Sequence, residues 1–247
     1  MYPILFNLGP LKIYSYGFML ALAFLVASFL IQRDLDKKGI DKEISFNLTF
    51  FTLIWGILGA RFFYVILHFE EFKYSIWEIF KIYHGGLTWY GGLTFGLIFV
   101  ITYLKLKKIP ILLVFDTGIP YIALAQSIGR IGCLLNGCCF GKASFEYGLY
   151  FPVYEKFLIP TQLISSLALL LIYGILRCLS RKDLKPGIIL FTYLFLYSTK
   201  RFFIEFLRAD SPMDFGPLSI FQIISLLIMI VSLVVIFILS NVKRIRS

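Results

Sequence analysis

Seven apolar stretches follow one another along the chain, and short polar segments separate them. They cover residues of about 14–32, 46–67, 88–104, 111–135, 160–179, 187–207 and 218–240. In a helix, which rises by roughly 1.5 Å per residue, each stretch is long enough to cross a hydrocarbon core of about 30 Å. The pattern therefore predicts an all-α polytopic membrane protein with seven transmembrane helices. No linker interrupts it, so residues 1–247 are expected to form a single membrane-embedded domain.

A different pattern occupies residues of about 70–83. Ile76, Ile79, Phe80 and Tyr83 recur at helical spacing, while the charged residues of the segment fall elsewhere on the helical wheel. This predicts an amphipathic helix that lies in the membrane interface.

Two glycine pairs follow, Gly85-Gly86 and Gly91-Gly92, with Trp89 and Tyr90 between them. They predict a bent, non-helical backbone, which at membrane depth is tolerated against protein or a water-filled cavity. The alternative is close packing of two helices through small residues.

Composition agrees with the membrane class. Hydrophobic residues make up 59% of the chain and its mean hydropathy is +0.85, above the roughly 45–50% apolar content of a soluble domain. The formal net charge is +10. Lipid headgroups are the expected counter-charge for this excess, and nucleic acid is not predicted as a partner.

Lysine and arginine are distributed unequally between the loops on the two sides. Most of the 24 lie in the loops after the first, third, fifth and seventh apolar stretches. The positive-inside rule places those loops in the cytoplasm, so the N-terminus is predicted outside and the C-terminus cytoplasmic.

Several charged residues lie within the apolar stretches. Arg201 and Glu205 are four residues apart and should face each other on a helix, with Tyr197 and Arg208 on the same face. Arg61 and Arg130 also lie in apolar runs, where an unpaired charge costs at least ~2.5 kcal/mol. The arginines predict an anionic ligand, and the alternative is an ion pair that only joins helices.

Arg130 lies among small and polar residues. Gly129 and Gly132 flank it and Asn136 follows, which would let backbone approach a ligand beside a guanidinium that can bind phosphate in a bidentate manner. Asp116 and Gln126 are interpreted as polar contacts inside the bundle.

Three of the four cysteines, Cys133, Cys138 and Cys139, are close together in the sequence. Their spacing fits no common zinc pattern, so no metal site is predicted and packing of small side chains is the main interpretation. A disulfide from Cys133 to Cys138 or Cys139 is left open.

These segments, taken in order, resemble the bacterial prolipoprotein diacylglyceryl transferase family. The similarity spans nearly the whole chain, and no single fragment decides it. The matching segments are Tyr16-Gly17, Leu58 to Arg61, Gly85 to Gly92, Gly129 to Gly132 with Asn136-Gly137, Pro160 to Leu163, and Arg201 to Arg208.

The resemblance implies an enzyme of the bacterial cytoplasmic (inner) membrane. It would transfer the diacylglyceryl group of phosphatidylglycerol to the lipobox cysteine of a prolipoprotein signal peptide and release glycerol phosphate outside the cytoplasm. Membrane lipids are its surroundings, and no metal or cofactor is required.

The resemblance also implies roles for individual residues. Arg130 and Arg201 would bind phosphate, Glu205 would orient Arg201 or support proton transfer, and Tyr90 would take a catalytic position where many relatives have histidine. Tyr16 would contact the headgroup or the acceptor. The remaining predicted substrate-binding residues are Arg61, Gly129, Asn136 and Tyr197.

The chain departs from the family pattern at several positions. Cys133 and Cys138 replace an asparagine and an acidic residue of the usual signature, and Ile159 replaces a common histidine. Two other functions therefore stay open: a divergent family member with another acceptor, and an anion or lipid transporter, which intramembrane charges also fit.

Overall fold

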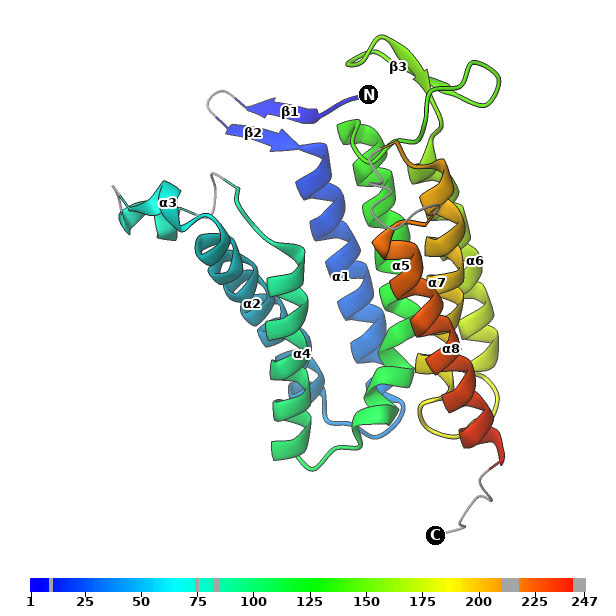
Figure 1. Cartoon of the computed structure of the whole chain (residues 1–247). Coiled ribbons are helices and arrows are strands. Elements are labelled where there is room, and N and C mark those ends of the chain that lie inside the picture. Colours follow the sequence, from blue (N-terminus) through cyan, green and yellow to red (C-terminus); the bar gives the residue numbers. More distant parts are fainter. Residues whose placement is uncertain (9–10, 74–75, 82–84, 210–217, 242–247) are drawn as a thin grey trace. The chain divides into compact units, whose positions relative to one another are not determined.

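The computed structural model describes residues 1–8, 11–73, 76–81, 85–209 and 218–241. It is mostly helical, and each of the seven apolar stretches forms a helix (Figure 1). These helices are α1 (Ser15–Asp36), α2 (Lys42–Leu67), α4 (Trp89–Leu106), α5 (Ile111–Asn136), α6 (Thr161–Leu179), α7 (Ile188–Leu207) and α8 (Ile220–Asn241).

Six of the described helices are long and apolar enough to cross a membrane, which makes this a polytopic membrane protein. The exception among the seven is α7, which carries Lys200, Arg201 and Glu205. The most apolar of the six is α8, in which an 18-residue stretch has a mean hydropathy of 3.2 and is only 11% buried in the protein. Its exposed apolar side chains are those that lipid would cover.

The all-α prediction is wrong in one respect, because two antiparallel hairpins are present. Strands β1 (Ile4–Leu8) and β2 (Leu11–Tyr14) pair ahead of α1, and β3 (Leu149–Phe151) pairs with β4 (Lys156–Leu158) between α5 and α6. Both hairpins carry aromatic residues, and the first also carries isoleucines, residue types that favour strands. Their strands are too short to stand out in a pattern of apolar stretches long enough to cross a membrane.

The predicted continuous helix at 70–83 is replaced by two short elements. These are α3 (Phe69–Phe72) and the 3-10 helix η1 (Ile76–Phe80). Residues 74–75 and 82–84, which include Tyr83 and His84, lie outside the described residues. A helical period in the side chains did not ensure an unbroken helix here, and the interfacial location stays a prediction.

The chain divides into two compact units, residues 1–31 with 115–247 and residues 32–114. In the second unit, α2 packs against α4. Side chains at Gly59 and Gly91 would collide with the facing helix, because a Cβ on Gly91 would meet the Gly59 carbonyl oxygen and one on Gly59 would meet Phe95. Glycine therefore allows close contact between these helices.

The second glycine pair, Gly91-Gly92, thus serves close packing of two helices, which was the alternative to a bent backbone. Gly91 and Gly92 lie inside α4, and Gly92 faces Gly56 and Ala60 of α2. The prediction of a non-helical backbone holds at Gly85 and Gly86, whose φ angles are +86° and +73°. At Gly91 and Gly92 it is wrong, because these two glycines serve helix packing.

In the first unit, α7 packs against α6 and α8. A buried apolar cluster joins α5, α6 and α7 through Ile119, Ala123, Ile172, Leu176, Ile189 and Tyr193. Buried hydrogen bonds also join these helices. Ser127 of α5 and Ser166 of α6 exchange hydrogen bonds.

Asp116 and Gln126 have the structural roles predicted for them. The Asp116 carboxylate accepts hydrogen bonds from the backbone N–H groups of Gly187 (2.6 Å) and Leu190 (2.9 Å). It thereby caps the start of α7 from a neighbouring helix, where unpaired N–H groups favour a negative charge. Gln126 accepts a hydrogen bond from the Tyr193 hydroxyl at 2.9 Å.

Candidate active site

The predicted ion pair in α7 is confirmed. Nη2 of Arg201 lies 2.9 Å from Oε2 of Glu205, and the Glu205 side chain is 2% exposed. One helical turn separates the two residues, which is the spacing at which side chains meet on a helix. Arg201 itself remains 20% exposed, so its guanidinium is fixed by Glu205 without being enclosed.

The start of α8 fixes the other carboxylate oxygen of Glu205. The Ser219 hydroxyl donates a hydrogen bond to Oε1 of Glu205 at 3.2 Å. The Gln222 side chain in turn accepts from the Ser219 N–H at 2.8 Å. The Arg201 guanidinium lies over the ring of Phe221, 5.0 Å from its centroid. Arg201 is therefore held from two helices.

Lys200 is a buried cation that the sequence analysis did not assign to the site. Its side chain is buried, and its ammonium lies 4.3 Å from the centroid of the Tyr197 ring. Both Arg130 and Arg201 lie within electrostatic reach of it. Neighbouring cations in a medium of low dielectric repel one another, and an anion bound between them would remove that repulsion.

Arg130 of α5 is the third member of this cationic cluster, which we define as Arg130, Lys200 and Arg201. Arg130 is half-buried and interacts electrostatically with the other two. The Arg130 guanidinium donates no hydrogen bond to any residue that the structure describes. Gly129, beside it, has open space where a side chain would be.

Tyr16 and Asn136 lie at the same end of the first unit as Arg130. A Cβ on Gly132 would lie 2.9 Å from Cβ of Met19, so this glycine lets α1 and α5 approach closely. That approach brings Tyr16, at the start of α1, within electrostatic reach of Arg130. Asn136 is exposed at the last position of α5.

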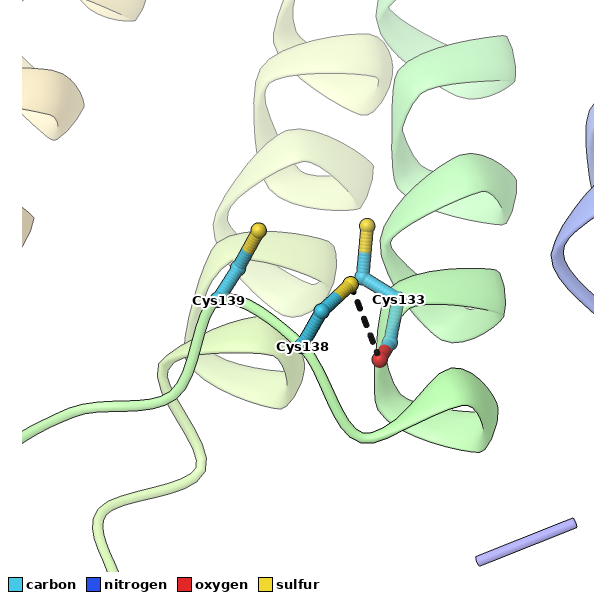
Figure 2. Close-up of side chains that lie close together, drawn as sticks. All are labelled: Cys133, Cys138 and Cys139. Carbon is cyan, nitrogen blue, oxygen red and sulfur yellow. Dashed lines mark hydrogen bonds between the residues drawn. The ribbon is translucent and has the colours of Figure 1, made fainter. Parts of the chain in front are cut away.

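The three neighbouring cysteines come together where α5 ends (Figure 2). Gly137, with a φ of +77°, ends α5, and its N–H and that of Cys138 bond to Leu134 and Cys133, which is the Schellman pattern. The three Sγ atoms all lie within 4.8 Å of one another, and none forms a disulfide.

The buried Arg61 side chain forms several hydrogen bonds within the second unit. Its guanidinium donates to the carbonyl oxygens of Glu78 (2.6 Å), Ile79 (2.8 Å), Gly85 (2.8 Å) and Gly86 (3.1 Å). Arg61 therefore joins α2 to the segment that follows η1. Its predicted substrate-binding role stays a prediction, beside this observed structural one.

Tyr90 lies in the first turn of α4 with 60% of its surface exposed. It belongs to the second unit with Arg61, whereas Tyr16, Gly129, Arg130, Asn136, Tyr197, Arg201 and Glu205 belong to the first. Among the latter set, Tyr197 and Glu205 contact members of the cationic cluster, and Tyr16 lies within electrostatic reach of Arg130.

The cluster is suited to an anion that carries more than one negative charge. Three cations lie together, and the negative charge of Glu205 pairs with Arg201. Arg201 and Arg130 supply planar groups that match phosphate oxygens, and Lys200 adds a compact charge.

Comparison with known proteins agrees with this chemistry. The sequence profile of the prolipoprotein diacylglyceryl transferase family matches residues 3–238. A phosphatidylglycerol–prolipoprotein diacylglyceryl transferase of Clostridium tetani is 37% identical over 253 residues, covering 100% of both chains. A second transferase of that name from Clostridium perfringens is 34% identical over 96% of this chain and 93% of its own. One from Staphylococcus aureus is 34% identical over 94% of this chain and 86% of its own.

Proposed function

The chain belongs to the prolipoprotein diacylglyceryl transferase family, and from this premise we propose how its cationic cluster carries out the transfer. The function is that of a phosphatidylglycerol–prolipoprotein diacylglyceryl transferase. Its substrates are phosphatidylglycerol and a prolipoprotein.

The reaction exchanges one bond for another. The sulfur of the prolipoprotein cysteine attacks the glyceryl carbon that is esterified to phosphate. A carbon–sulfur bond forms, the carbon–oxygen bond breaks, and its electron pair leaves with the phosphate oxygen as glycerol phosphate. The thiol gives up its proton before or during the attack, since the thiolate is the nucleophile.

The cationic cluster suits the change in charge during this step. The phosphate begins as a diester with one negative charge and leaves as a monoester that develops a second. Cations held in place at that oxygen stabilise the transition state more than the bound lipid, which is what accelerates a reaction. We assign Arg130, Lys200 and Arg201 to the phosphate group.

The neighbouring residues support this assignment. Glu205, held by Arg201 and Ser219, is proposed to orient the Arg201 guanidinium or to support proton transfer. Tyr16, Gly129, Asn136 and Tyr197 are proposed to contact the headgroup or the acceptor. Tyr16 lies within electrostatic reach of Arg130, Gly129 is its neighbour in the chain, and Tyr197 lies against Lys200. Tyr90 is proposed to act on substrate. Arg61 is proposed to bind substrate, beside its observed contacts with the segment that precedes Tyr90.

The membrane arrangement is also part of the proposal. Counting α7 as a span gives seven transmembrane helices, with the N-terminus outside and the C-terminus in the cytoplasm of a bacterial cell. The cluster would then lie toward the outer leaflet of the cytoplasmic membrane.

The observation that carries the proposal is the fixed Arg201–Glu205 pair beside two further cations, and an activity assay tests it. Purified protein in detergent is given phosphatidylglycerol labelled in its diacylglyceryl group and a lipobox peptide. We expect label on the peptide cysteine, reduced at least about tenfold in Arg130→Ala and in Arg201→Lys, which keeps charge but loses the two-pronged contact. Arg33→Lys, an exposed change on α1, is the control.

Each other outcome separates the alternatives. Glycerol phosphate release without peptide labelling would indicate another acceptor. A folded protein that turns over no lipid but moves anions or lipid across vesicles would be a transporter. A fully active Arg201→Lys protein would contradict the role given to the guanidinium.

A further inference from the structure

Cys133, Cys138 and Cys139 are held in one place by the surrounding structure. Figure 2 shows their sulfur atoms on one side of the loop that follows α5, with a weak hydrogen bond from the Cys138 thiol to the Cys133 carbonyl at 3.7 Å. Cys139 has a φ of +61°, which is unusual for a residue other than glycine. Such strain persists where the surroundings fix it and is common at functional sites.

Two buried side chains of α6 fix this loop. The Gln162 side-chain amide donates to the Cys138 carbonyl at 2.7 Å, and the Thr161 hydroxyl donates to the Cys139 carbonyl at 2.6 Å. Both side chains are almost fully buried. Outer contacts of this kind orient the residues that bind a ligand.

The spacing of the thiols fits a metal ion. Zinc–sulfur bonds of about 2.3 Å in a tetrahedron place the sulfurs about 3.8 Å apart. The three Sγ atoms already lie within 4.8 Å of one another. Shifts of about 1 Å in the sulfur positions would bring them to the spacing of tetrahedral zinc ligands. Soft thiolates select zinc over magnesium or calcium.

The charge also fits. A zinc ion with three thiolates carries a net charge of −1, and the guanidiniums of Arg130 and Arg208 lie within electrostatic reach of Cys139. Within the described ranges, no histidine or carboxylate joins the three thiols. Three protein ligands with an open fourth position are typical of reactive rather than structural zinc sites.

We propose that Cys133, Cys138 and Cys139 bind one zinc ion whose fourth position accepts an exogenous thiol. This rests on the proposed function for the identity of that thiol, the prolipoprotein cysteine. On binding, the thiol loses its proton to water and becomes a zinc-bound thiolate. The later transfer is the carbon–sulfur bond formation already described, and the zinc undergoes no redox change.

Metal binding is tested first, without any activity measurement. The full-length protein is purified under reducing conditions in detergent, loaded with zinc, desalted and analysed for metal content. We expect about one zinc per chain, lost in Cys133→Ser and Cys139→Ser and retained in Cys178→Ser, because Cys178 is an exposed cysteine of α6 and not part of the cluster. Cobalt in place of zinc should give thiolate-to-metal absorption.

Alkylation of the unchanged chain covers the case in which a serine variant fails to fold. Zinc should slow alkylation of the three clustered cysteines and leave Cys178 equally reactive. Less than about one tenth of a zinc per reduced, folded chain, or equal alkylation with and without zinc, would overturn the proposal. So would full zinc retention in Cys133→Ser, which would indicate binding elsewhere.

The open position is tested with the cobalt form. A lipobox peptide should change the cobalt spectrum, whereas the same peptide with serine in place of cysteine should not. Identical spectra with the two peptides would overturn the thiol-binding part. If zinc binds and the thiol peptide perturbs cobalt, but no lipid is transferred, the site stands and the proposed function fails.

Discussion

Lys200 is the residue whose contribution to lipid binding can be measured most directly. Lys200→Met removes the charge and keeps an unbranched side chain of similar length in a buried position, so the protein should fold. Contacts to a charged group contribute about 1.5–3 kcal/mol. We therefore expect kcat/KM for phosphatidylglycerol in mixed micelles to fall about tenfold or more, through a lower kcat as well as a higher KM, because the phosphate gains charge in the transition state.

The control for this substitution is Lys182→Met, an exposed lysine in the segment between α6 and α7, which should leave both constants unchanged. Lys200→Arg should recover part of the lost affinity, because it restores the charge. A Lys200→Met protein with the kcat/KM of the unchanged enzyme would remove Lys200 from the phosphate site.

Arg61 allows a structural role to be separated from a substrate-binding one. Arg61→Lys cannot reach the four carbonyl oxygens that the guanidinium contacts, and carbonyls left unpaired in a buried site cost about 1–3 kcal/mol each. We expect a lower melting temperature in detergent and faster proteolysis near residues 78–86. These measurements precede any assay of activity.

Gly86→Ala is the matching change on the other side of this contact. A Cβ there would lie 2.6 Å from Nη1 of Arg61, at a backbone position with a φ of +73°, so it should destabilise the same segment. Gly17→Ala, which has open space around it, is the control. If Arg61→Lys leaves stability and proteolysis unchanged but raises the KM, the substrate-binding prediction would be favoured instead.

The contacts of some single residues could be predicted from the sequence, and those of others could not. The Arg201–Glu205 contact follows from spacing within one helix and was predictable. Lys200 was not assigned because no motif marks it, and its proximity to Arg130 depends on how α5 and α7 pack. The Arg61 contacts depend on carbonyl groups 17 to 25 residues away, which side-chain patterns do not reveal.

At the scale of elements, close contact between α2 and α4 should depend on Gly59. In Gly59→Ala the added methyl group would collide with Phe95 and the Gly91 carbonyl. We expect a lower melting temperature, since overpacking typically costs about 1–3 kcal/mol. Gly174→Ala in α6 has nothing within 4 Å of the new methyl group and should be neutral or stabilising, by up to ~1 kcal/mol.

The melting temperatures of these two variants are compared directly, because both exchange a helical glycine for alanine. Equal melting temperatures would mean that α2 and α4 do not pack as described. Helix positions could be predicted because long apolar runs are strong signals. The role of Gly91 and Gly92 could not, since glycine pairs mark both bent backbone and helix contacts.

At the scale of the whole molecule, the sequence predicted the long helices, while their division into two compact units depends on packing. Length and hydropathy define each helix separately, but α1 and α5 each contribute residues to both compact units. Such sharing depends on packing between segments far apart in the chain. The cysteine cluster is a similar case, because its preorganisation needs Thr161 and Gln162 of α6.

The number of spans depends on α7, and its orientation can be measured. Each of its cations costs about 2.5–3.5 kcal/mol in a translocon-inserted helix centre, but Arg201 pairs with Glu205 and the rest of the helix is apolar. We predict that α7 crosses the membrane.

The orientation of α7 is tested with two reporters fused after Ala209. These are alkaline phosphatase, which is active outside the cytoplasm, and green fluorescent protein, which fluoresces inside. Phosphatase activity without fluorescence is expected. Fusions at Ala143 and Lys182 are the controls, with phosphatase active at the first and fluorescence at the second. Fluorescence at Ala209 would leave six spans and place the cationic cluster on the wrong side for an extracytoplasmic transferase.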